Sequence, residues 1–162
     1  RFTLATGNSP GNDMRFSDEK VKASRNFANK LWNAARFVLM YLTDDFKYNG
    51  LPSDLAVEDE WIVSKVNTLA KDVTDNLEKY ELGIAIQKLY DFIWDVFCDW
   101  YIEMIKPILY GENEAEKAET RAAFAWVRDR ILVILHPFMP FITTELWNNT
   151  AQRDIKLSLI HI

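Results

Sequence analysis

Lysine, arginine and asparagine side chains recur at helical spacing in residues 17–42, the stretch SDEKVKASRNFANKLWNAARFVLMYL. Lysine and arginine bind phosphates, asparagine hydrogen-bonds to base edges, and an aromatic ring stacks on a base. The stretch contains no Pro or Gly, and at about 100° per residue these side chains share one side. That side carries Lys22, Asn26, Asn29, Lys30, Asn33, Arg36, Phe37 and Met40. The spacing therefore predicts a helix with one face suited to binding RNA.

The other side of the same predicted helix is apolar and is expected to face a protein core. It carries Val21, Ala28, Leu31, Ala35, Val38, Leu39 and Leu42, with Phe27 and Trp32 at its two edges. A polar stripe on an amphipathic helix is more often only a solvated face, and Phe37 and Met40 would also fit against a neighbouring helix. Periodicity alone therefore indicates a helical bundle of unknown function.

Positive charge is concentrated near this predicted helix. The whole chain has a formal net charge of −5, which argues against general binding of nucleic acid. Residues 1–36 nevertheless carry a net charge of +4, and the remaining residues carry −9. Acidic surface elsewhere would repel a polyanion and restrict where it docks. Chance clustering gives the same pattern, so the charge distribution is supporting evidence only.

Four blocks of the sequence resemble valyl-tRNA synthetases. The segment RNFANKLWNAARFVLM (25–40) is similar to the helix that opens their anticodon-binding domain. The similarity continues in the same order through ATGNSPGNDMRF (5–16), YDFIWDVFCDWYIEMIKPILYGENE (90–114) and LHPFMPFITTELW (135–147). The last block also resembles the synthetases for isoleucine and leucine, so the assignment to valine depends on the other blocks.

The resemblance implies an all-α, antiparallel helical bundle of four long helices and one short one. It also implies recognition of the anticodon stem-loop of tRNA(Val), because an aromatic residue at the place of Phe37 contacts an anticodon base in that family. Some relatives carry Arg where Glu19 stands here, so no base contact is expected from Glu19. We expect Asn29 and Asn33 to read base edges, and Asn26 to lie in the same binding face. Phosphates would be held by Lys22, Lys30 and Arg36. Arg25 would either bind RNA or anchor the junction with the preceding fold.

Caps, breakers and periodicity predict the order of the helices. Ser17 is expected to cap the first helix, with Asp18 and Glu19 in its first turn. A second helix is expected at about 55–79, capped by Asp54 or Ser53, and a third at about 82–106, ended by Pro107. A fourth is expected at about 113–135, and a short fifth from Pro140 to near Trp147. The third of these five helices has little polar surface and should lie in the middle of the bundle.

Three regions are expected along the chain. Residues 1–16, which open with the last turns of a helix, would form the tail of a junction fold, and residues 17–150 would form the bundle. Residues 151–162 would form a C-terminal tail, whose DIKLSLIHI alternates like a strand and departs from the family pattern. Because the chain opens on Arg1, we expect it to be a piece of a longer protein.

Catalytic signatures are absent from the sequence. It has no Gly-rich phosphate loop, no Ser/His/Asp or Cys/His set and no HExxH motif. The HIGH and KMSKS nucleotide-binding motifs of the resembled enzymes are also missing. We therefore expect no cofactor in this fragment, whereas its parent, a valine–tRNA ligase, would use ATP to attach valine to tRNA. One cysteine and no signal peptide favour a cytosolic protein, and no apolar run reaches the roughly 18 residues of a membrane segment. We also expect a monomer.

Asp91, Asp95, Asp99 and Glu103 form an acidic ladder at four-residue spacing. Such a ladder suggests a metal site, but carboxylate-bridged bundles also use His, and none lies near it. We expect instead a solvated stripe, or one paired by Arg or Lys side chains. Arg121, Arg128 and Arg130 could contact this ladder or the RNA, and we favour the ladder. His136 precedes a Pro and is expected to be a helix cap rather than a catalyst.

Two alternatives remain open from the sequence. The first is the same domain from an isoleucyl- or leucyl-tRNA synthetase. The second is a helical scaffold that docks another protein and does not bind RNA.

Overall fold

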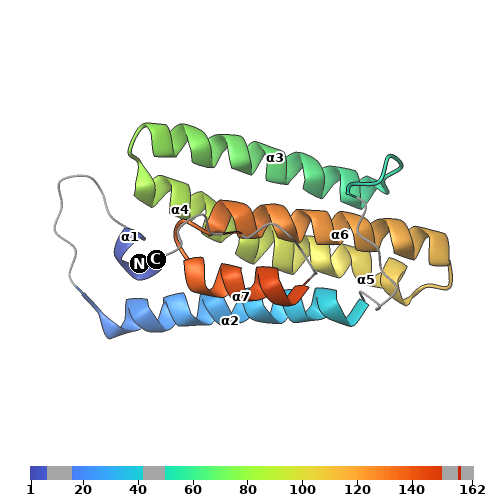
Figure 1. Ribbon diagram of the computed structural model, residues 1–162, viewed down its shortest axis with the longest axis horizontal. Helices are drawn as coiled ribbons and strands as arrows, with labels where there is room; N and C mark the ends of the chain where they lie inside the picture. The colour runs from blue at the N-terminus through green and yellow to red at the C-terminus, as the bar shows by residue number, and fades with distance from the viewer. Residues whose placement is uncertain (7–15, 42–49, 151–156, 158–162) are drawn as a thin grey trace.

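The computed structural model describes residues 1–6, 16–41, 50–150 and 157, and it is an antiparallel bundle of helices (Figure 1). Four long helical rods run along its length in alternating directions, and the chain begins and ends with a short helix. No strand occurs among the described residues. The helices are α1 (Phe2–Ala5), α2 (Asp18–Tyr41), α3 (Val57–Glu78), α4 (Leu82–Asp91), the π-helical stretch η1 (Phe92–Tyr101), α5 (Ile102–Tyr110), α6 (Glu114–Leu135) and α7 (Pro140–Thr150). The predicted all-α bundle is confirmed.

The third rod is continuous from α4 through η1 to α5, and it lies in the middle of the bundle, against α2, α3 and α6. The prediction that Pro107 ends this rod was wrong, because the rod continues to Tyr110. Proline removes one backbone hydrogen bond, but Ile105 and Leu109 on either side of it are buried in the core. Packing of these two side chains keeps the last turn helical.

A column of stacked rings fixes α1 against α2 and α4. The centroids of Phe2 and Phe27 are 5.0 Å apart, and those of Phe27 and Tyr90 are 4.9 Å apart. Trp94 continues the column, 5.6 Å from Tyr90. Four aromatic side chains, from α1, α2, α4 and η1, therefore hold the start of the chain to the bundle.

A buried polar network ties α3, η1 and α6 together. The fully buried carboxylate of Asp59 accepts a hydrogen bond of 2.6 Å from the Tyr101 hydroxyl and one of 3.1 Å from the Thr120 hydroxyl. Burial raises the pKa of Asp59, and the two hydrogen bonds oppose this rise. The network satisfies polar groups that would otherwise be costly inside the core.

The helix boundaries agree with the predicted ranges better than the caps do. Ala56, rather than Asp54 or Ser53, precedes α3, and it makes no side-chain cap bond, so that prediction was wrong. Ser17 directly precedes α2, and its carbonyl oxygen accepts a hydrogen bond from the backbone amide of Val21. His136 ends α6, with Nδ1 2.8 Å from the Thr143 hydroxyl, as expected of a structural residue. The predicted strand at 154–162, except Leu157, lies outside the described residues.

Candidate nucleic-acid interface

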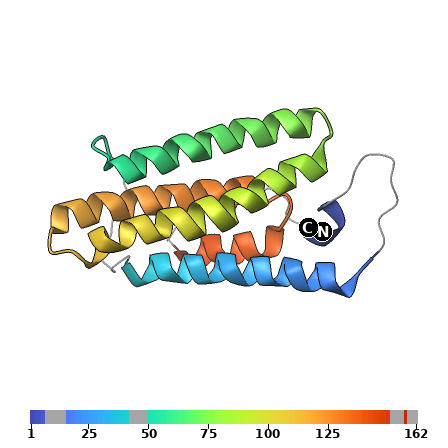
Figure 2. The same ribbon diagram turned by 180° about the vertical axis from the view of Figure 1, so that it is seen from behind.

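Helix α2 lies along one edge of the bundle, so one of its sides faces away from the other helices (Figures 1 and 2). Its buried residues are Phe27, Leu31, Ala34 and Ala35. Compared with the prediction, the buried side of the helix is shifted toward the Phe27 edge, and α7, α6 and η1 all pack against α2. Val21, predicted to be inside, is exposed, and Trp32 at the opposite edge is 38% exposed.

The outward side of α2 carries three cations and three carboxamides, which we call the α2 polar face. Its members are Lys22, Arg25, Asn26, Asn29, Asn33 and Arg36, and all six are exposed. Within the described part of the chain, none of the six side chains has a hydrogen bond or ion pair to another residue. The predicted binding face is therefore open over most of its length.

Carboxylates are also missing from most of α2. After Asp18 and Glu19 in the first turn, the helix has no acidic residue as far as Tyr41. In a chain with a net charge of −5, this is a local concentration of positive charge. Such a surface attracts phosphates, and each phosphate neutralised by Lys or Arg releases counterions.

Lys30, predicted to be part of the binding face, has partners within the protein. Its Nζ is 2.7 Å from Asp99 Oδ1 and lies 3.8 Å from the centroid of the Trp94 ring. The Lys30 side chain is 23% exposed. Lys30 therefore joins α2 to η1 at the edge of the α2 polar face.

Two of the four carboxylates of the acidic ladder are paired by lysines, which agrees with the expected Arg- or Lys-paired stripe. Asp99 binds Lys30, and Glu103 binds Lys106. Arg128 instead binds the neighbouring Asp129, and Arg121 lies 3.8 Å from Glu114. Arg130 lies over the ring of Trp126. The expectation that Arg121, Arg128 and Arg130 pair with the ladder was wrong.

Phe37 lies at the margin between the α2 polar face and the core, and it is half-buried. Its ring centroid is 4.9 Å from that of Tyr41 and 6.2 Å from that of Phe124. Lys106 Nζ is 5.9 Å from the same ring. Phe37 therefore contributes to packing and keeps part of its surface toward solvent.

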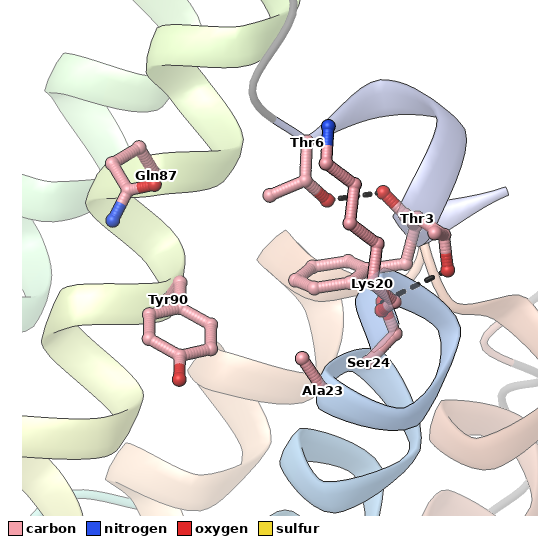
Figure 3. A pocket seen from close by; sticks show the side chains of 8 residues that line it. Thr3, Thr6, Lys20, Ala23, Ser24, Gln87 and Tyr90 are labelled. Carbon is pink, nitrogen blue, oxygen red and sulfur yellow. Dashed lines mark hydrogen bonds between the residues drawn. The ribbon is translucent and has the colours of Figure 1, made fainter. Parts of the chain in front are cut away.

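A cavity of about 250 Å³ lies between α1, the start of α2 and α4 (Figure 3). Gln87 and Tyr90 approach it from α4, opposite Thr3 and Thr6 of the first segment. The Thr3 hydroxyl donates a 2.8 Å hydrogen bond to the Ser24 hydroxyl, so α1 and α2 are linked at its wall. No sequence pattern predicted this cavity, because its lining comes from three separate segments.

Other kinds of site find little support in the described residues. Among them, no group of three or more His, Cys, Asp or Glu is arranged to hold a metal ion. None of their helices is long and apolar enough to span a membrane. Burial raises the pKa of the Cys98 thiol to about 12, so this thiol is protonated at neutral pH.

A family model described as the anticodon-binding domain of tRNA ligase matches residues 59–161. The chain belongs to this family. The matched range starts after α2, but alignments with individual relatives include α2 as well.

The relatives with high identity are valine–tRNA ligases. The chain is 53% identical over 151 residues to the one from Clostridium acetobutylicum, covering 92% of this chain and 17% of that protein. It is 51% identical over 161 residues to the one from Clostridium perfringens, covering 98% of this chain and 18% of that protein. The resemblance to valyl-tRNA synthetases is thus confirmed, and the chain spans less than a fifth of the length of these relatives.

Solved structures show the same fold. Methionyl-tRNA synthetase from Mycobacterium tuberculosis in its free state matches 94% of this chain, and 32% of that chain, with a TM-score of 0.74 and 19% identity. The same enzyme in complex with methionyl-adenylate matches with a TM-score of 0.75. At this identity the likeness concerns the fold alone.

Proposed function

We propose that this chain is the anticodon-recognition part of a valine–tRNA ligase and binds the anticodon stem-loop of tRNA(Val) along α2. The observation that carries the proposal is the α2 polar face, six exposed cations and carboxamides without partners among the described residues. Membership in the anticodon-binding family and the identity to valine–tRNA ligases support it. A face that is merely solvated would tolerate carboxylates, whereas the sequence from Lys20 to Tyr41 contains none.

The individual roles follow from the chemistry of each side chain. Lys22, Arg25 and Arg36 hold phosphates, while Asn26, Asn29 and Asn33 form hydrogen bonds with exposed base edges. Phe37 offers the outward part of its ring to a base. Lys30 supports this face by its pair with Asp99 rather than as a free cation.

The catalytic steps belong to the rest of the parent protein. That protein would use ATP to activate valine and would then transfer it to tRNA, and this fragment would need no cofactor of its own. We expect the parent to act in the cytoplasm, since acylated tRNA is used where ribosomes work, and we also expect it to be a monomer. Residues 1–16 would join its catalytic part to the bundle of residues 17–150. The ring of Phe2 packs on Phe27 and so ties the start of this junction to the bundle core.

Binding of isolated anticodon stem-loops tests the proposal. The 162-residue chain is titrated with stem-loops of the valine, isoleucine and leucine tRNAs, at several salt concentrations. We expect the valine stem-loop to bind tightest, with an affinity that falls as salt rises. Tighter binding of the isoleucine or leucine stem-loop would assign the chain to a sister synthetase. No salt-dependent binding of any stem-loop would favour a protein-docking scaffold and overturn the proposal.

A further inference from the structure

Three rings meet where the end of α2 lies beside the end of α5, and we call them the α2–α5 aromatic cluster (Phe37, Tyr41 and Tyr110). The centroids of Phe37 and Tyr41 are 4.9 Å apart, and those of Tyr41 and Tyr110 are 6.0 Å apart. Burial and a hydrogen bond with Tyr110 raise the pKa of Tyr41 to about 12. The cluster therefore spans two helices that are far apart in the sequence.

Two of the apolar side chains here are highly exposed. Tyr110 is 66% exposed although its edge contacts Tyr41, and Met40, on the next turn of α2 after Arg36, is 75% exposed. Their burial contributes little to the fold, since most of each surface remains in water. An exposed ring that is grouped with other rings, as Tyr110 is, marks an interaction site more often than an isolated exposed residue does.

The charges around the cluster favour an RNA loop as the occupant. Arg36, one residue before Phe37, is exposed and has no partner in the part of the chain that the structure describes. Lys106 lies over the Phe37 ring and is neutralised by Glu103. Glu103 and the exposed Glu112 flank the α5 side. Arg36 would therefore hold the RNA backbone on the α2 side, with the bases turned toward the rings, and Lys106 would meet a phosphate only by leaving Glu103.

We propose that Tyr110 and Lys106 of α5 extend the RNA-binding face beyond α2. Tyr110 stacks on a second unpaired base of the loop, beside the base at Phe37, and Lys106 exchanges its carboxylate partner Glu103 for a phosphate. This inference rests on the proposed function. It adds two residues about 70 positions beyond the α2 polar face in the sequence.

Substitution of Tyr110 tests the stacking. Loss of one base–ring contact in Tyr110→Ala should weaken binding of the valine anticodon stem-loop about 5- to 150-fold. Tyr110→Phe keeps the ring and should bind within about twofold of the unchanged chain. The matched control is Tyr80→Ala, an 87% exposed tyrosine in the α3–α4 turn at the other end of the bundle (Figure 1). This control should leave the affinity unchanged.

A fluorescent base reports the contact directly. Stem-loops carrying 2-aminopurine at single loop positions should show, at one position, quenching on binding that is lost in Tyr110→Ala and kept in Tyr110→Phe. A merely structural role for Tyr110 would not produce such position-specific quenching. The thermal midpoint of each variant is compared, and it should change little because Tyr110 is mostly exposed.

Substitutions at Glu103 and Lys106 test whether Lys106 exchanges its carboxylate partner for a phosphate. Lys106→Met should lower the slope of log affinity against log salt by about 0.7–0.9, the value for one phosphate. Glu103→Gln frees Lys106 and should strengthen binding. Lys71→Met, which removes a lysine paired with Asp75 on α3, is the control and should leave the slope unchanged.

The outcomes separate this inference from the proposed function. If Arg36→Ala weakens binding while Tyr110→Ala and Lys106→Met bind like the unchanged chain, recognition is confined to α2 and the inference is overturned. If the unchanged chain binds no stem-loop, both proposals fail. Loss of affinity in Tyr110→Ala together with retention in Tyr110→Phe and Tyr80→Ala supports both.

Discussion

Two sets of polar side chains in this bundle have opposite surroundings. The α2 polar face is exposed and has no partners among the described residues, whereas the Asp59 network is fully buried and its hydroxyl and carboxylate groups are paired. Both sets lie on long amphipathic helices. The difference is that α3 has neighbours where Asp59 lies, while the outward side of α2 has none.

This contrast separates side chains that hold the fold from those that are free to bind. A paired, buried polar group contributes to stability because removing one partner leaves another unsatisfied. An exposed, unpaired cation contributes little to stability but remains available to a phosphate. Lys30 and Phe37 lie between the two sets, since each has protein contacts and some exposed surface.

The largest expected effect on stability comes from disrupting the buried hydrogen-bond network of Asp59. Asp59→Ala leaves the hydroxyls of Tyr101 and Thr120 without their acceptor, and we expect a loss of about 2–4 kcal/mol in the free energy of unfolding. Urea denaturation followed by circular dichroism measures this loss. A loss below about 1 kcal/mol would mean that the network contributes little. RNA affinity, measured where the variant is folded, should stay unchanged.

Removing the cations of the α2 polar face should weaken RNA binding and leave stability nearly unchanged. The triple substitution of Lys22, Arg25 and Arg36 to Ala removes about three phosphate contacts, so the salt slope should fall by about two to three units. At 0.1 M salt this corresponds to roughly a hundredfold weaker binding of the stem-loop. The unfolding midpoint in urea should change little. A matched triple of exposed lysines on α3 and its following turn (Lys65, Lys71 and Lys79) should leave the RNA affinity unchanged.

Phe37 should show both effects in one residue. Phe37→Ala is expected to weaken stem-loop binding by about 1–3 kcal/mol. Because the ring also packs on Tyr41 and Phe124, we expect a loss of stability of roughly 1–2 kcal/mol as well. Titration with RNA and urea denaturation separate the two losses. An unchanged affinity with lowered stability would make Phe37 a core residue only.

The smallest effect concerns acid pH. Burial raises the folded-state pKa of Asp59 above its ordinary 3.8, with Glu58 and Glu119 adding repulsion. The folded chain therefore keeps this proton to a higher pH than the unfolded chain, and stability falls as pH rises through the window between the two pKa values. In Asp59→Asn this decline should be absent. Urea denaturation at pH 4 to 7 measures the difference, at most about 1.4 kcal/mol per unit of pKa shift.

Much of the secondary structure could be predicted from local patterns. The ranges expected for the first, second and fourth helices agree with the structure to within about two residues, because apolar periodicity and the breakers Asn-Gly and Leu-Pro act locally. Pro107 misled the prediction, since burial of Ile105 and Leu109 outweighs the missing hydrogen bond. The predicted α3 cap was also wrong, because Ala56 lies at that position and has no side chain that could form a cap bond.

The candidate binding face could be predicted only in part. Six of its eight proposed residues are exposed, which their helical spacing indicated. Lys30 and Phe37 have protein contacts that no local pattern contains, since Asp99 lies 69 residues from Lys30 and Phe124 lies on α6. Contacts across such separations depend on how the rods are placed, so spacing along one helix could not indicate them.

The sequence by itself determined that the chain is helical, that α2 has a polar and an apolar side, and that the chain resembles the anticodon-binding part of valyl-tRNA synthetases. Only the tertiary structure decided the rotation of α2, which buries Ala34 and exposes part of Trp32. It also decided that Asp59 is buried and that Tyr110 lies beside Tyr41. The physical reason is that periodicity defines a broad apolar side, whereas the neighbouring helices determine which edge of that side is covered.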